Sequence, residues 1–135
     1  MKKEVINSPK IGPSFSNTTA HGVKAGGFLF VTGQVANPPG IDPKQGREKV
    51  GEMGSIEEQA VRVMENLRAI LDEAGTNFAN VVKRNVYLTH LSDFDPVYKV
   101  MERYFTSPVA STGVLTGLIP TSARVEIEVV AIIPD

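Results

Sequence analysis

The sequence has 135 residues, the size of one domain, and leaves no room for separate cofactor and substrate lobes. Its 14 lysines and arginines and 15 aspartates and glutamates give a net charge of −1, which offers no electrostatic footprint for nucleic acid or anionic membranes. The absence of cysteine excludes disulfides and thiolate nucleophiles and fits a reducing compartment. No apolar run is longer than a strand and none resembles a signal peptide, so we expect a cytoplasmic protein and no membrane or nucleic-acid partner.

Two short strands are predicted first, over residues 21–24 and 28–32, because a glycine-bearing turn, Ala25-Gly26-Gly27, separates two apolar runs. Residues 37–54 then hold three prolines and four glycines and predict a long loop. Loops of this length cover a site or an interface as a lid, or they are tolerated surface insertions. Both interpretations stay open at this point.

The strongest signal in the chain is a helix between Ser55 and Gly75. Ser55 and Glu58 have the spacing of a capping box, and apolar residues then recur at steps of three and four. Gly75 is the expected C-terminal cap.

The remaining elements are a strand over 81–88, a second helix and two closing strands, over 110–118 and 124–133. Ser92 or Asp93 is expected to cap the second helix, whose apolar positions extend to Tyr104 and Phe105. The order β-β-α-β-α-β-β predicts an α+β domain over residues 1–135, with two helices on one face of a mixed sheet. The opposite face then has to be buried by self-association.

Common catalytic motifs are absent: the sequence has no G-x-x-x-x-G-K-[ST], no G-x-G-x-x-G and no G-x-S-x-G. His21 and His90 lie 69 positions apart with no partner at ligand spacing, so we expect no metal site. His90 is interpreted as a loop histidine that bonds to backbone.

Glu126 is the notable carboxylate, because it stands between Val125 and Ile127 in a strongly apolar strand. A carboxylate there is either paired or functional. One interpretation is an ion pair across the sheet, or across a subunit boundary, with one of three nearby cations: Arg124, Lys83 or Arg84. The other is a role in a site.

Four segments in order resemble the YjgF/UK114 family, also called RidA: Phe28–Gln34, Glu65–Leu71, Val86–Phe94 and Val125–Ala131. The resemblance covers nearly the whole chain. It implies a chorismate-mutase-like α+β fold and a homotrimer with a central barrel, helices outside and clefts between subunits. The activity it implies is hydrolysis of enamines or imines, without metal or organic cofactor, while other members are described as ligand binders or as ribonucleases that inhibit translation. Fold alone does not choose among these activities.

The resemblance also assigns site residues. Thr32, Gly33 and Glu126 match the family pattern, with Glu126 as the carboxylate that activates water. Where the family places an arginine for the substrate carboxylate, this sequence has Ala110. The other positions of the cleft are Ser111, Thr112, Tyr98, Ser14 and Phe15.

We therefore expect an atypical family member that binds a small metabolite and possesses an enamine or imine deaminase activity based on Glu126. Hydroxyls of Thr32, Ser111 and Thr112 and backbone amides near Gly33 are expected to contact the ligand. The alternative is a non-catalytic binding or regulatory module, which the loss of the arginine favours. A ribonuclease is the third interpretation, and the near-neutral charge opposes it.

Overall fold

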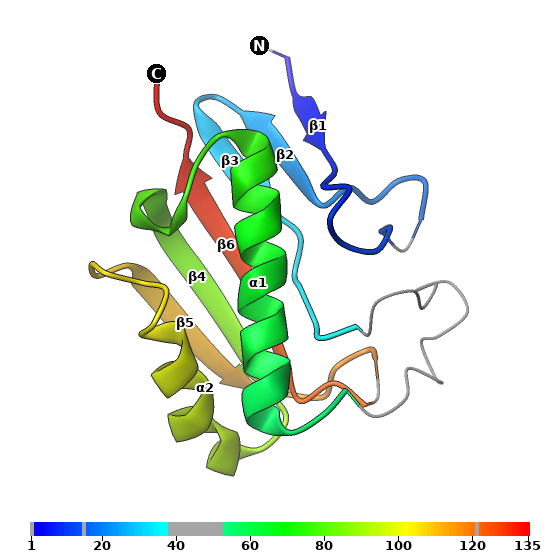
Figure 1. Cartoon of the computed structure of the whole chain (residues 1–135), viewed down its shortest axis with the longest axis vertical. Coiled ribbons are helices and arrows are strands. Elements are labelled where there is room, and N and C mark those ends of the chain that lie inside the picture. Colours follow the sequence, from blue (N-terminus) through cyan, green and yellow to red (C-terminus); the bar gives the residue numbers. More distant parts are fainter. Residues whose placement is uncertain (1, 15, 38–52, 121) are drawn as a thin grey trace.

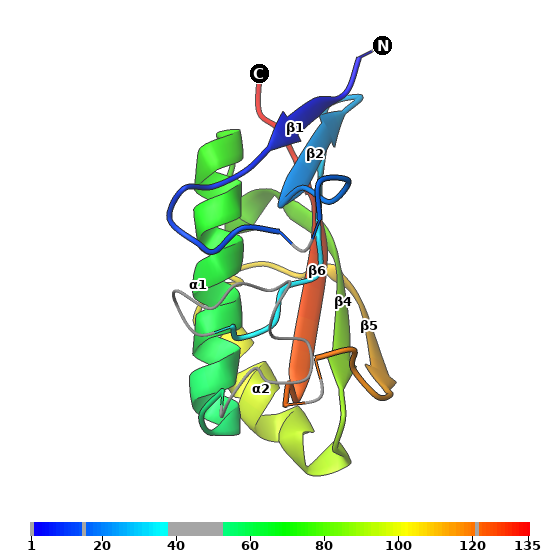
Figure 2. The same ribbon diagram turned by 90° about the vertical axis from the view of Figure 1, so that its right-hand side faces the viewer.

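The computed structural model describes residues 2–14, 16–37, 53–120 and 122–135. Within them, six strands form one sheet in the order β1-β2-β3-β6-β4-β5, and two helices cover one of its faces (Figures 1 and 2). This is the predicted α+β architecture. The elements are β1 (Glu4–Ile6), β2 (Gly22–Ala25), β3 (Phe28–Val31), α1 (Ile56–Ala74), β4 (Val81–Leu88), α2 (Phe94–Met101), β5 (Ala110–Leu115) and β6 (Val125–Ile132).

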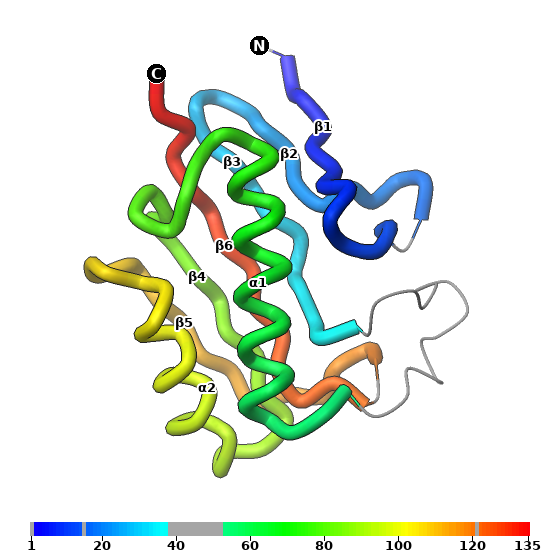
Figure 3. Tube along the Cα trace, viewed as in Figure 1, coloured from blue at the N-terminus to red at the C-terminus, as the bar shows by residue number. Residues whose placement is uncertain are grey.

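The sheet is mixed, as expected. Neighbouring strands are antiparallel except β4 and β5, which pair in parallel. The path of the chain in Figure 3 gives the reason. Helix α2 connects β4 to β5 and carries the chain back, so that β5 runs in the same direction as β4. Strand β1 was not predicted from the sequence.

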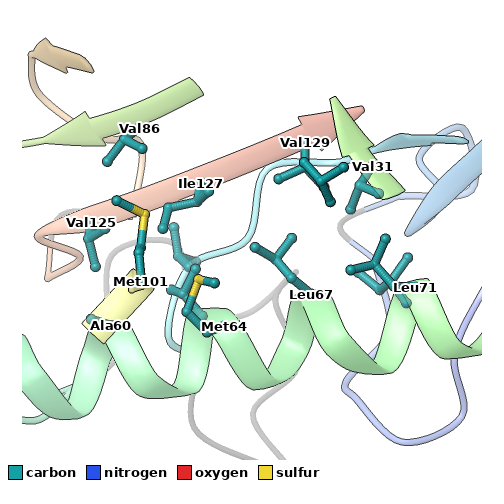
Figure 4. Close-up of a cluster of buried hydrophobic side chains, with 14 of the residues drawn as sticks. Val31, Ala60, Met64, Leu67, Leu71, Val86, Met101, Val125, Ile127 and Val129 are labelled. Atoms are coloured by element: carbon teal, nitrogen blue, oxygen red, sulfur yellow. The ribbon is translucent and has the colours of Figure 1, made fainter. Parts of the chain in front are cut away.

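Helix α1 has the predicted ends. Ser55 accepts a hydrogen bond from the Glu58 amide, the Glu58 carboxylate accepts one from the Ser55 amide, and Gly75 adopts a left-handed φ of 81°. The apolar side of α1 packs on the sheet, and each fully buried aliphatic side chain contributes about 1.5 to 3 kcal/mol to stability. Figure 4 shows this core between the helix and the strands, with α1 contributing Ala60, Met64, Leu67 and Leu71 and the strands contributing Val31, Val86, Val125, Ile127 and Val129.

Two details of the second helix differ from the prediction. Asp93 stands at the N-cap position, but its side chain makes no capping bond, because both carboxylate oxygens accept hydrogen bonds from Arg124. Ser92 does not cap the helix either. The helix ends at Met101, so Tyr104 and Phe105 lie beyond it and pack edge-on against Phe78 instead.

The face of the sheet opposite the helices is uncovered in one chain. Alternation in β3 buries Leu29 and Val31 and leaves Phe28 and Phe30 41% and 49% exposed on that face. The uncovered face agrees with the prediction that two helices can cover one side only. In the described part of the chain, no helix is long and apolar enough to cross a membrane.

Candidate functional site

Glu126 lies on the uncovered face of β6, against the backbone of Gly33. Its neighbours Val125 and Ile127 point into the core, so strand alternation directs Glu126 the other way. A β-carbon at Gly33 would lie 3.1 Å from the carboxyl carbon of Glu126, which explains why this position suits glycine. The pairing of Phe30 with Val130 and of Gln34 with Ile127 leaves one extra residue on the Gly33 side. This bulge brings the Gly33 backbone to the carboxylate.

The Glu126 carboxylate has no charge partner in the described part of the chain. Burial raises its pKa, and the nearby Glu128 carboxylate raises it further. Arg124 pairs with Asp93 at 2.5 Å, and Arg84 donates to Ser111. The predicted ion pair of Glu126 with Arg84 or Arg124 of the same chain is therefore wrong. The Lys83 amine also lies more than 4.0 Å from the Glu126 carboxylate. A pair across a subunit boundary stays a prediction.

Glu128, two residues further along β6, is a different kind of carboxylate. One of its oxygens accepts hydrogen bonds from the Tyr87 hydroxyl at 2.5 Å and from the Asn85 amide at 3.1 Å. The bond to Glu128 raises the pKa of the Tyr87 phenol. A shallow cavity of about 150 Å³ opens beside Glu128 on the uncovered face, lined by Phe30, Val31, Lys83, Asn85, Glu128, Val129 and Val130. Glu128 is thus held in a network, whereas the Glu126 oxygens accept no side-chain hydrogen bond from the described residues.

Two of the loop residues predicted around Glu126 use their hydroxyls in hydrogen bonds to backbone carbonyls. The Thr32 hydroxyl donates to the carbonyl of Ala20 at 2.6 Å, and the Ser14 hydroxyl donates to the carbonyl of Thr19. Thr32 and Gln34 donate their amides to backbone carbonyls, while the Gly33 amide makes no hydrogen bond within the described ranges. This amide is one donor close to Glu126 that the described residues leave available. Phe15 lies outside the described residues, as does most of the predicted 37–54 loop.

The β5 residues of the predicted site are not brought to Glu126 in one chain. In the sheet register Glu126 pairs with Tyr87, and Ala110 pairs with Lys83, four residues earlier on β4. Two strand spacings and four residues of rise separate their backbones by about 16 Å. Thr112 is exposed on β5, level with Asn85. One small ligand can therefore contact Glu126 and the β5 residues together only where two copies of the chain meet.

Ser111 lies on the side of β5 that faces the helices, and Tyr98 lies on α2, which packs on that side. The Tyr98 ring stacks on Phe94 with centroids 4.2 Å apart, and its hydroxyl lies 3.2 Å from where a β-carbon at Gly113 would stand. The Ser111 hydroxyl accepts a hydrogen bond of 2.9 Å from Nε of Arg84. These contacts join α2, β4 and β5 on the face opposite Glu126.

Sequence reasoning missed the environment of Arg84. Its guanidinium carbon lies 5.4 Å from the Tyr98 ring centroid and 4.8 Å from that of Phe105. Burial lowers the pKa of Arg84, while the Tyr98 and Glu102 side chains act in the opposite direction. The alternation of side chains along β4 could have indicated it, since Arg84 lies on the same face of the strand as the buried Val86 and Leu88.

In the described residues, neither histidine belongs to a group of three or more His, Cys, Asp or Glu side chains that could hold a metal ion. His21 is buried: its Nδ1 accepts from the Ser8 amide, and its Nε2 bonds the Gly12 carbonyl at 2.8 Å. His21 therefore fastens the N-terminal segment. His90 is exposed and bonds through Nδ1 to the Thr89 hydroxyl, so its predicted side-chain bond to backbone is replaced by a bond to a neighbouring side chain.

Comparison with known proteins places these features in a family. The Endoribonuclease L-PSP family model matches residues 12–133. A RutC family protein of Pyrococcus abyssi is 39% identical over 132 residues, which cover 97% of this chain and 98% of that protein. The chloroplastic Reactive Intermediate Deaminase A of Arabidopsis thaliana is 33% identical over 97% of this chain and 66% of its own length. The crystal structure of a "putative endoribonuclease" from Thermotoga maritima has a TM-score of 0.82 and 34% identity, with all of both chains covered.

Proposed function

This chain belongs to the Endoribonuclease L-PSP family, the YjgF/UK114 or RidA family of the sequence motifs, and from that premise we propose that it hydrolyses an enamine or imine in clefts between copies of the chain. The observation that carries the proposal is Glu126: a half-buried carboxylate with a raised pKa, no partner in the described residues, and the free Gly33 amide beside it. A relative of this chain is named Reactive Intermediate Deaminase A, which supports the reaction class.

The chemistry follows from the position of the carboxylate. Glu126 takes a proton from a water molecule as the water oxygen attacks the imine carbon, which forms a carbon–oxygen bond and opens the carbon–nitrogen double bond. The protonated Glu126 returns this proton to the nitrogen, which gives a carbinolamine. The carbinolamine hydroxyl then loses its proton to Glu126, which passes it to the nitrogen, while the oxygen forms the carbonyl and the carbon–nitrogen bond breaks. The imine and one water become a carbonyl compound and ammonia. A positioned general base contributes about 10² to 10⁴ in rate, and its raised pKa brings it nearer to the working pH.

The clefts require more than one copy of the chain. Glu126 and Ala110 belong to separate places on one sheet, and the face that carries Glu126 is uncovered. We propose a homotrimer in the cytoplasm, with small-molecule ligands and without nucleic-acid or membrane partners. Such an assembly places the β5 residues of one subunit near Glu126 of the next.

Two alternative functions each have one observation in their favour. A non-catalytic binding module is favoured by one observation, the alanine at position 110, which removes a charged contact to the ligand. The ribonuclease interpretation is favoured by the names of the family model and of the Thermotoga maritima structure. The net charge of −1 opposes it, because binding to phosphates depends on cations.

The test is Glu126→Gln, with Glu57→Gln as the matched control because Glu57 is an exposed helix carboxylate paired with Arg103. Ammonia release is measured from freshly generated 2-iminopropanoate and a panel of larger imines and enamines. We expect Glu126→Gln to lose about 10² to 10⁴ in rate and Glu57→Gln to match the wild type. Unchanged turnover in Glu126→Gln contradicts the mechanism. Binding without ammonia release from any substrate by the wild type supports the non-catalytic module.

A further inference from the structure

The guanidinium of Arg84 is a half-buried cation without a counter-ion in the described part of the chain. Among the described residues, no carboxylate oxygen lies within 4.0 Å of it. Within the described ranges, its one hydrogen bond runs from Nε to the Ser111 hydroxyl. Glu102 influences it from a greater distance. A partly desolvated cation that lacks an opposite charge is unfavourable by itself and attracts an anion.

The contacts of Arg84 fix its orientation. The rings of Tyr98 and Phe105 lie near the guanidinium, within the range of cation–π contacts, and Ser111 occupies Nε. An arginine has five donor hydrogens, of which Nε uses one, and the two terminal nitrogens make no hydrogen bond to the described residues. Two parallel donors on these nitrogens have the geometry of a carboxylate.

Access to these donors comes from the edge of the sheet. Ser111 and its neighbours Ala110 and Thr112 are exposed along β5, and β5 is the last strand of the sheet. A ligand that reaches Ser111 therefore reaches the guanidinium behind it. The residues involved come from four segments of the chain: β4, α2, the segment after α2 and β5.

We propose that Arg84, oriented by Ser111, Tyr98 and Phe105, binds the carboxylate of a small organic acid at the β5 edge. The anion site itself stands on these contacts alone. Its assignment to the substrate rests on the proposed function: the substrate is then an imino or enamino acid whose carboxylate is bound by Arg84 of one subunit while Glu126 of a neighbouring subunit acts on its imine carbon, because Ala110 on β5 carries no charge.

The test measures binding of benzoate and pyruvate by titration calorimetry, with benzamide as the neutral analogue of benzoate and inorganic phosphate as the other anion. Arg84→Met removes the charge and keeps an extended apolar side chain, and Arg84→Lys keeps the charge without the planar pair of donors. Arg103→Met is the control, because Arg103 is exposed and paired with Glu57. We expect one of the acids to bind the wild type and Arg103→Met equally. Arg84→Lys should bind it about tenfold more weakly and Arg84→Met about a hundredfold more weakly.

Wild-type affinity for the acid in Arg84→Met overturns the proposal, as does the absence of acid binding by the wild type. Binding of phosphate or benzamide as tight as that of benzoate overturns the carboxylate assignment. If Arg84→Met fails to fold, Arg84→Lys decides: an unchanged affinity contradicts a two-donor contact.

Glu126→Gln separates this inference from the proposed function. It should bind the acid as the wild type does, because Glu126 lies on the opposite face of the sheet. Acid binding that depends on Arg84 in a protein without hydrolytic activity keeps the anion site and rejects the hydrolase. Turnover that depends on Glu126 and is indifferent to Arg84, in kcat and in KM, keeps the hydrolase and rejects the assignment of the anion site to the substrate, while the acid titrations decide the anion site itself.

Discussion

Glu126 is held by packing and strand alternation, with no opposite charge on it from the described residues, and this determines how it affects stability. Its pKa is raised first by burial and then by Glu128. A raised pKa means that the folded chain holds the proton more firmly than the unfolded chain does. The free energy of unfolding therefore decreases as pH rises from the ordinary glutamate value of 4.5 toward the folded value, and above that the loss is complete.

We accordingly expect Glu126→Gln to be more stable than the wild type at pH 7, because the amide removes a poorly solvated charge next to Glu128. The difference should shrink as pH falls below 4.5, where the wild-type carboxyl is protonated in both states. Thermal melts of both proteins between pH 4 and pH 8 measure it, with Glu57→Gln as the control. A Glu126→Gln variant that melts below the wild type at pH 7 would instead reveal a cation from another subunit on Glu126.

Among individual residues, the sequence singled out Glu126 but not Arg84. Alternation with Val125 and Ile127 was enough to single out Glu126, because the strand pattern is local. The surroundings of Arg84 depend on Tyr98 and Phe105, which are 14 and 21 positions away, and on the parallel pairing that brings Ser111 alongside. No local spacing encodes those contacts.

Among the elements, the start of β6 is fastened to both helices by polar contacts. Arg124 donates to both oxygens of Asp93, whose side chain is 3% exposed, just before α2. The amide of Arg124 donates to the buried Gln59 side chain, which also bonds the Gly54 carbonyl at the start of α1. One residue therefore couples two helix N-termini to the sheet.

We expect Arg124→Met to destabilise the fold by about 3 kcal/mol, because it leaves the buried Asp93 carboxylate without its cation. In a domain of this size that corresponds to a melting temperature lower by about 10 °C. Arg103→Met, which breaks an exposed pair, should change stability by less than about 1 kcal/mol. Chemical denaturation of the three proteins measures both values, and equal effects of the two substitutions would refute a structural role for the Asp93 pair.

Element prediction succeeded where the signal was local. The capping box of Ser55 and Glu58 and the glycine at position 75 located α1 to the residue. Strand β1 has three residues and is visible only through its pairing with β2. The interpretation of Asp93 as a cap failed because Arg124, 31 residues later in the sequence, occupies both of its carboxylate oxygens. No local pattern indicates that contact.

For the whole molecule, the uncovered sheet face leads to a prediction about assembly. Phe28 and Phe30 on that face, together with the family membership, support a homotrimer. Size exclusion with light scattering should give about three times the chain mass at micromolar concentration. Phe30→Lys should shift the mass toward that of one chain, because a charge on this face opposes its burial, and Leu91→Lys, at an exposed position in the turn before α2, should not. A wild-type protein with the mass of one chain would contradict the trimer and the clefts together.

Strand β5 adds a consequence for solubility. It is the last strand of the sheet, all six of its residues are exposed, and it ends in Val114 and Leu115. The outer side of an exposed edge strand can recruit strands from other molecules. A free subunit therefore carries an open template for aggregation even while its fold is intact. Substitutions that weaken the assembly should for this reason lower the amount of protein in solution before they lower the stability of the fold.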